Sequence, residues 1–84
     1  MRIIKRSEAV EVADGSFPRR RIVVLERDDG RFSFAEEYYY KTEWEGELVA
    51  EGWQQHPPNG IYATAEIAER EGLAAFATWH RLAK

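Results

Sequence analysis

The sequence predicts an α+β fold: an antiparallel meander of three or four strands with one C-terminal helix packed across one face. Two turn signals, Asp28-Asp29-Gly30 and Glu45-Gly46, each separate segments with strand composition. A helical pattern follows Thr64 and continues to about Leu82. Between them, the stretch RFSFAEEYYYKTEWEGELVAEGWQQH interleaves aromatic residues with glutamates. Such alternation is typical of strands with one buried and one solvated face.

The first hairpin is predicted from RRIVVLERDDGRFSFAEEYYY. Asp28-Asp29-Gly30 suits a three-residue loop whose last residue adopts the left-handed conformation, which glycine tolerates. Because loop length fixes the register of a hairpin, the facing pairs can be stated in advance. They are Val24 with Phe34, Ile22 with Glu36, Arg21 with Glu37, and Arg20 with Tyr38.

The second hairpin turns at Glu45-Gly46 and returns along ELVAEGW. A two-residue turn there pairs Tyr38 with Trp53, Tyr40 with Glu51 and Thr42 with Val49. One face of the sheet then carries Phe32, Phe34, Tyr38, Tyr40, Val49 and Trp53. The other face carries Ser33, Ala35, Glu37, Tyr39, Lys41, Leu48, Ala50 and Gly52. We expect the helix to cover the first, aromatic face.

The C-terminal helix has a clear predicted start. Pro57 and Pro58 cannot continue a central strand, and Thr64 is a good N-cap residue. The face predicted to meet the sheet consists of Ala68, Gly72, Ala75, Phe76, Trp79, Leu82 and Ala83. Gly72 in a helix interior indicates either a close approach to the sheet or a kink.

The 84 residues are expected to form a single domain, 1–84. Within it, 1–18 is an N-terminal strand or loop, 20–55 the meander and 64–82 the helix. The absence of cysteine excludes disulfides and thiolate metal sites, and it favours a cytoplasmic location. No segment is apolar enough to cross a bilayer, and we expect neither a secretory signal nor a cofactor.

Charge is unevenly distributed along the chain. Residues 1–31 hold eight basic against six acidic side chains, whereas residues 32–63 hold one lysine against six glutamates. Arg19, Arg20 and Arg21 could contact phosphate, and sheet aromatics could stack on bases. The acidic hairpins would repel a polyanion, so nucleic-acid binding is the second hypothesis. The favoured interpretation pairs these arginines with Glu36, Glu37 and Glu51, within the chain or across a subunit boundary.

The first strand of the meander is apolar on both sides. Its second face needs a cover, either the N-terminal segment or another chain. The predicted apolar centre of that face consists of Val23, Leu25, Tyr39 and Leu48. A homodimer through this face is therefore one prediction.

No motif predicts catalysis. The glutamates lie on turns and alternating strand positions, and neither histidine shows metal-ligand spacing. We therefore expect a non-enzymatic binding or self-association module without a metal site. A third hypothesis places a small ligand between helix and sheet, near Tyr62, Trp53 and Trp79.

The ending WQQHPPNGIYATAEIAEREGLAAF resembles the strand-to-helix junction of small three-strand-plus-helix domains, including the AP2/integrase-type DNA-binding domains. That resemblance implies a sheet that reads the major groove. This chain departs from the pattern because such a sheet displays arginine and tryptophan, whereas this one displays glutamate. The whole chain more closely resembles small uncharacterised bacterial proteins, which implies no activity.

Overall fold

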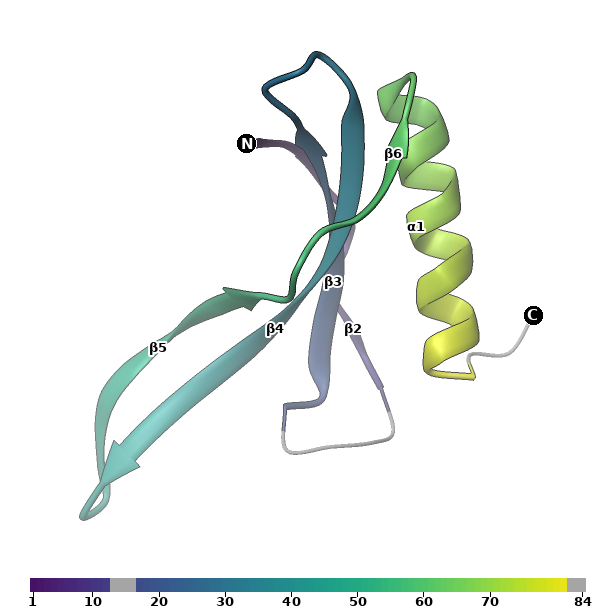
Figure 1. Cartoon of the computed structure of the whole chain (residues 1–84). Helices are drawn as coiled ribbons and strands as arrows, with labels where there is room; N and C mark the ends of the chain where they lie inside the picture. The colour runs from purple at the N-terminus through teal and green to yellow at the C-terminus, as the bar shows by residue number, and fades with distance from the viewer. Residues whose placement is uncertain (13–16, 82–84) are drawn as a thin grey trace.

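A curled antiparallel sheet carries one helix in the computed structural model, which confirms the predicted α+β fold class (Figure 1). The structure describes residues 1–12 and 17–81. Within these residues the strands and helix are β1 (Arg2–Arg6), β2 (Val10–Glu11), β3 (Arg19–Glu26), β4 (Phe32–Trp44), β5 (Glu47–Gln55), β6 (Asn59–Tyr62) and α1 (Ala65–Trp79).

Strands β3 and β4 form the centre of the sheet, and each outer edge is shared by two further strands. β1 and β2 both pair with β3, whereas the sequence predicted one N-terminal strand. Ser7 joins them: its N–H donates to the Ile22 carbonyl at 2.8 Å, and its Oγ accepts from the Ile22 N–H at 2.9 Å. β5 and β6 share the other edge, along β4. β6 was not predicted.

The first hairpin has the predicted register. The facing pairs include Val24 with Phe34, Ile22 with Glu36, Arg21 with Glu37, and Arg20 with Tyr38. Gly30 has a φ of 83°, in the left-handed region that the three-residue loop requires. The turn therefore fixes which side chains share a face along both central strands.

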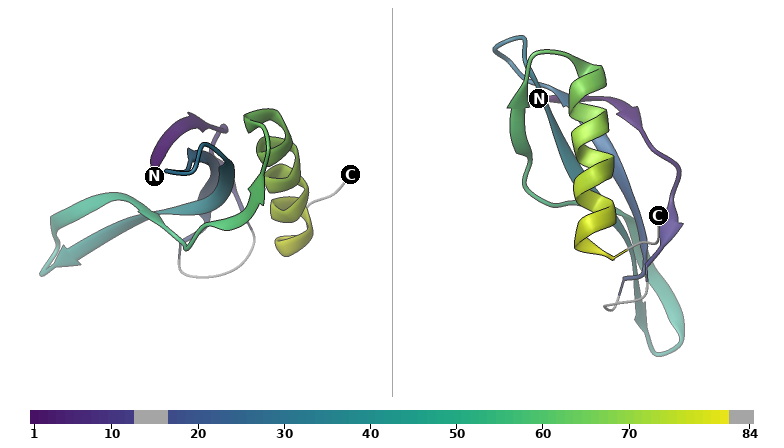
Figure 2. Two further views of the ribbon diagram at one scale, coloured as in Figure 1. Left: turned by 45° about the horizontal axis from the view of Figure 1, so that its top comes forward. Right: turned by 90° about the vertical axis from the view of Figure 1, so that its right-hand side faces the viewer.

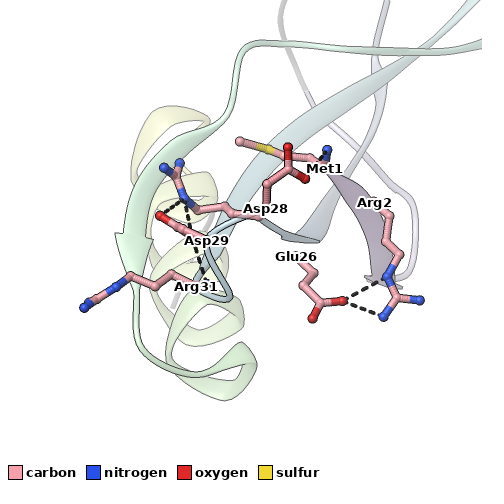
Figure 3. A network of polar contacts seen from close by, with 7 residues as sticks. Met1, Arg2, Glu26, Asp28, Asp29 and Arg31 are labelled. Carbon is pink, nitrogen blue, oxygen red and sulfur yellow. Dashed lines mark hydrogen bonds and ion pairs between the residues drawn. The ribbon is translucent and has the colours of Figure 1, made fainter.

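Polar contacts surround the turn between β3 and β4 and the neighbouring start of β1 (Figure 3). Asp29 Oδ1 accepts the Arg31 N–H at 2.9 Å, and the Arg27 guanidinium lies 3.2 Å from the same oxygen. Both donors hold the pKa of Asp29 below its ordinary value, the Arg31 amide being the larger cause. Across the sheet edge, Arg2 donates to Glu26. The turn and the start of β1 are thus fixed by charged hydrogen bonds.

The main core lies between α1 and the sheet. It consists of Val12, Ile22, Phe34 and Phe76, with Tyr62 and Ala75 packed against them. Gly72 lies at the closest approach: a Cβ added there would be 2.8 Å from Phe34 Cγ and 3.0 Å from Ile22 Cγ2. The helical glycine is therefore explained by close packing.

α1 begins where it was predicted to begin, but it ends earlier. Thr64 is the N-cap, and its hydroxyl accepts the Ile67 N–H at 3.2 Å. The helix ends at Trp79, before the predicted limit of about Leu82. His80 caps it, and Arg81 leaves it in the left-handed conformation, with a φ of 54°. Leu82 and Ala83, predicted to extend the helix face, lie outside the described residues.

A second, smaller core lies on the opposite face of the sheet. Val23, Leu25 and Ala35 are fully or almost fully buried there, and Ile3 of β1 packs against them. Figure 2 shows how the sheet curls, with β1 turned out of the plane of β4 and β5. The N-terminal strand thus contributes part of the cover that this face was predicted to need.

Candidate functional site

The outer part of the β4–β5 hairpin projects from the body of the molecule, on the side away from α1 (Figure 1). β4 and β5 reach beyond the N-terminal end of β3, because Arg20, the outermost paired residue of β3, faces Tyr38. The radius of gyration is 14.1 Å, against about 12 Å for a compact domain of this length. The projecting hairpin makes the chain elongated.

The tip of the hairpin is a tight two-residue turn. Trp44 faces Glu47, and the turn residues Glu45 and Gly46 have φ values of 53° and 84°. Two successive positive φ angles define a type I′ turn, whose twist matches that of a hairpin. The predicted turn position is therefore confirmed.

The predicted register beyond this turn is wrong, because β5 carries a β-bulge opposite the step from Thr42 to Glu43 of β4. Thr42 faces Ala50, and Val49 is the extra residue. Every later pair shifts by one, so Tyr39 faces Trp53, Tyr40 faces Gly52 and Lys41 faces Glu51. A one-residue shift moves a side chain to the other face. Trp53 therefore lies on the face opposite α1 and not in the helix-covered aromatic wall.

Large apolar side chains are exposed at the tip. The exposed fractions are 71% for Trp44, 51% for Leu48 and 63% for Val49. Four glutamates on the outer hairpin, against Lys41, make its surface acidic; they are Glu43, Glu45, Glu47 and Glu51. Exposed apolar residues surrounded by charge are typical of a protein-binding surface.

Three consecutive arginines of β3 fix the base of the hairpin by stacking on aromatic rings. The guanidinium carbon of Arg21 lies 3.9 Å from the centroid of the Trp53 ring. The corresponding distances are 5.4 Å from Arg20 to Tyr38 and 5.7 Å from Arg19 to Tyr39. Each pair falls within the range of cation–π attraction.

Two of these arginines also pair with buried carboxylates, as the favoured interpretation predicted. Arg20 Nη1 lies 2.7 Å from Glu36 Oε2, and Arg21 Nε lies 2.7 Å from Glu37 Oε1. Glu36 and Glu37 are only 4% and 5% exposed. A phosphate would have to displace these carboxylates to reach Arg20 or Arg21. The third predicted phosphate contact, Arg19, is exposed and stacks on Tyr39.

Glu36 also joins the helix to the sheet. His80 Nε2 lies 2.9 Å from the same Oε2 atom that Arg20 contacts. The His80 ring packs edge-on against Phe76, with centroids 4.8 Å apart. One carboxylate thus connects β3, β4 and the C-terminal end of α1. The sequence suggested neither this burial of Glu36 nor its contact with His80.

Glu51 does not pair with an arginine. Its carboxylate accepts a hydrogen bond from Tyr39 Oη at 2.6 Å. This hydrogen bond is the main cause that raises the pKa of Tyr39 above its ordinary value. Tyr39 also contacts Trp53, with ring centroids 5.3 Å apart. These contacts hold β4 and β5 together just beyond the end of β3.

Two shallow hollows lie on either side of Phe17, where the hairpin leaves the body. One, of about 250 Å³, is lined by Phe17, Tyr38, Tyr40, Lys41, Thr42 and Gln54. The other, of about 320 Å³, is lined by Glu11, Phe17, Pro18, Arg19, Tyr39 and Lys41. Both are open to solvent, and no charged group is buried in either of them.

The predicted interface on the second face is not formed as expected. Val23 and Leu25 are 0% and 2% exposed, so neither can contact another chain. Tyr39 is partly buried against Trp53, and Leu48 lies exposed near the tip. Of the four predicted residues, only these two remain accessible, and both belong to the hairpin.

The predicted ligand site between helix and sheet does not come together either. Tyr62 and Trp79 both contact Phe34, with ring centroids 6.1 Å away in each case. Trp53 lies on the other face with Tyr39 and Arg21. Among residues 1–12 and 17–81, no three His, Asp or Glu side chains are grouped so that they could hold a metal ion. In the same described part, the helix is too short and too polar to span a membrane.

Comparison of the chain with protein-family models, curated proteins and solved structures found no match. The resemblance of the strand-to-helix ending to AP2/integrase-type domains therefore stays a prediction.

Proposed function

We propose that this chain is a non-enzymatic self-association module, and that a second copy binds to the projecting β4–β5 hairpin. The observation that carries the proposal is the exposure of Trp44, Leu48 and Val49 at the tip of a hairpin along which β3 pairs no further than Tyr38. The body supplies the contrast, because both of its cores are closed by the chain itself. A cytoplasmic location is part of the same proposal.

Sedimentation velocity from micromolar to millimolar concentration tests the proposal. We expect the weight-average sedimentation coefficient to rise with concentration, and the variant Leu48→Ser/Val49→Ser to remain monomeric at concentrations where wild type associates. The matched control is Leu73→Ser, which removes an exposed leucine from α1, away from the hairpin. A wild-type chain that stays monomeric throughout, or a Leu73→Ser effect as large as that of the hairpin variant, would overturn the proposal.

A further inference from the structure

The free edge of β5 is the best-defined binding feature of the hairpin. The His56 N–H donates to the Glu36 carbonyl at 2.9 Å, which makes this a hydrogen-bonded pair. Hydrogen-bonded and non-bonded pairs alternate along an antiparallel ladder. In the observed register, Gln54 and Gly52 therefore also direct their backbone groups toward β4. It follows that Glu51, Trp53 and Gln55 direct their N–H and C=O groups away from it.

Among the described residues no strand other than β4 pairs with β5, and Arg21 of β3 reaches the Trp53 ring across the face of the sheet, so this edge is open. The opposite edge of the sheet is protected: β1 carries Arg2, Lys5 and Arg6, and a bulge interrupts its ladder. Cationic side chains and bulges are common devices that prevent strand addition. Residues 51–55 contain neither proline nor lysine, and their bulge lies before them, next to Ala50.

We propose, on the basis of the proposed self-association, that two copies pair antiparallel through β5, with a twofold axis at Trp53. The three outward-directed residues are spaced evenly about Trp53. This register therefore places Trp53 opposite the partner's Trp53 and Glu51 opposite the partner's Gln55. Each facing pair exchanges two backbone hydrogen bonds, so every outward group of the three residues is satisfied.

Side-chain charge and the position of Pro57 favour this register over the two registers whose axis lies at Glu51 or Gln55. An axis at Glu51 would place two glutamates directly opposite each other, which is destabilising. An axis at Gln55 would place Trp53 opposite Pro57 of the partner, which has no N–H to donate. With the axis at Trp53, the Glu51 carboxylate instead faces the amide of the partner's Gln55.

The acidic tips are also kept apart in this arrangement. Antiparallel pairing places the two Glu45-Gly46 turns at opposite ends of the joined strands. Continuing the same register brings Val49 and Leu48 toward the partner's Pro57 and Pro58. The exposed apolar side chains near each tip thus gain an apolar neighbour.

Cysteine cross-linking tests the register directly, because the chain contains no cysteine of its own. Gly52 faces the partner's Gln54 in a non-hydrogen-bonded pair, where Cα atoms lie about 4.5 Å apart, within disulfide range. We expect a mixture of Gly52→Cys and Gln54→Cys chains to form a disulfide-linked heterodimer on mild oxidation. A Cβ at Gly52 meets only the Tyr40 ring, at 3.7 Å, so the variant should fold. Each variant oxidised alone is the control, and neither should cross-link at a comparable rate.

A proline at the edge provides an independent test. The Gln55 N–H points away from β4, so Gln55→Pro removes an intermolecular donor and leaves the β4–β5 ladder intact. We expect it to raise the dimer dissociation constant roughly tenfold or more, while Gln55→Ala leaves that constant nearly unchanged. Circular dichroism and thermal unfolding at low concentration check that Gln55→Pro still folds.

The two proposals fail in different ways. If the chain dimerises but the cysteine mixture does not cross-link and Gln55→Pro dimerises like wild type, the β5 register is wrong and self-association stands. If Trp44→Ser abolishes the dimer while Gln55→Pro does not, the contact is made by the tip. A chain that is monomeric at every concentration overturns both proposals.

Discussion

Gly72 lies where α1 crosses the central strands, and its lack of a side chain sets the distance between helix and sheet. A Cβ at this position would lie 2.8 Å and 2.9 Å from two Phe34 atoms, one of which is Cβ and therefore close to the backbone. Relief requires movement of the helix or of β4, because Phe34 cannot rotate its own Cβ away. The residue is thus determined by packing, against its low helix propensity.

Gly72→Ala is expected to destabilise the fold by about 1–3 kcal/mol, since overpacking outweighs the helix propensity gained. Urea unfolding followed by tryptophan fluorescence measures the change. The matched control is Ala74→Gly on the exposed side of α1, which should lose about 1 kcal/mol from propensity alone. A more stable Gly72→Ala variant would show that helix and sheet are not in close contact at this point.

Glu36 is the buried acid whose contacts extend furthest through the structure. Glu36→Ala would leave the Arg20 guanidinium buried without its carboxylate and would remove the contact with His80. We expect a loss of about 3–5 kcal/mol in the free energy of unfolding. Glu26→Ala breaks the exposed ion pair with Arg2 and should cost no more than about 1 kcal/mol. Similar costs for the two variants would contradict the role of Glu36 as the connection between helix and sheet.

Tyr39 is expected to titrate above its ordinary pKa because its hydroxyl donates to Glu51. A pKa raised in the folded state stabilises the fold fully below the unfolded pKa of about 10. That stabilisation is lost as the pH rises through the folded value. Glu51→Gln should lower the pKa of Tyr39. NMR of the labelled tyrosine ring as a function of pH measures this change. Glu47→Gln, which removes a charge at the tip, is the control, and an equal effect of both variants would exclude a specific hydrogen bond.

At the scale of elements, the two hairpins show what sequence could and could not predict. The Asp28-Asp29-Gly30 loop fixes the register of β3 and β4, and the facing pairs predicted from this loop are the observed ones. The Glu45-Gly46 turn was also correct, but the bulge at Val49 was not predicted, because ELVAEGW contains no signal for an unpaired residue. Trp53 was consequently placed on the wrong face, with the helix instead of with Arg21.

Deleting Val49 tests the bulge. Val49 is unpaired and largely exposed, so its removal should give a regular hairpin and leave Trp53 opposite Tyr39. We expect little change in stability, within about 1 kcal/mol, and retained NOE contacts between Arg21 and the Trp53 ring. Deleting both Val49 and Glu51 is the contrasting control, because a regular hairpin then places Trp53 opposite Tyr40, on the other face, and removes those contacts. Loss of the NOE contacts between Arg21 and Trp53 on deleting Val49 would contradict the observed register.

The remaining differences also arise from contacts that lie far apart in the sequence. β6 joins the edge of β4 after Pro57 and Pro58, held partly by the hydrogen bond from Ser33 Oγ to the Gly60 carbonyl at 2.6 Å. No local sequence pattern indicates that β6 will pair with the same edge of β4 that β5 occupies further along the strand. The pairing of Arg21 with Glu37 was predictable because the first hairpin placed them opposite each other, and the same register makes Glu36 the diagonal neighbour of Arg20 on one face. The contact of His80 with Glu36 was not.

At the scale of the whole molecule, the chain combines a closed body with an open hairpin. α1 covers one face of the sheet, and Ile3 of β1 contributes to the cover of the other. Of the two predicted covers for Val23 and Leu25, the N-terminal segment or another chain, the N-terminal segment is the one that packs there. In the described chain the outer edge of β5 is left unpaired, near the exposed side chains of Trp44, Leu48 and Val49. The proposed self-association therefore adds to a fold whose two cores the chain already closes.

Residue-resolved amide hydrogen exchange at two protein concentrations tests this account most directly. The amides of Gly52 and Gln54 bond to β4 and should exchange slowly at both concentrations. Those of Glu51, Trp53 and Gln55 should exchange rapidly in dilute solution and become protected at high concentration, as a second β5 strand pairs with them. Rapid exchange of these three amides at every concentration would contradict the proposed role of the β5 edge.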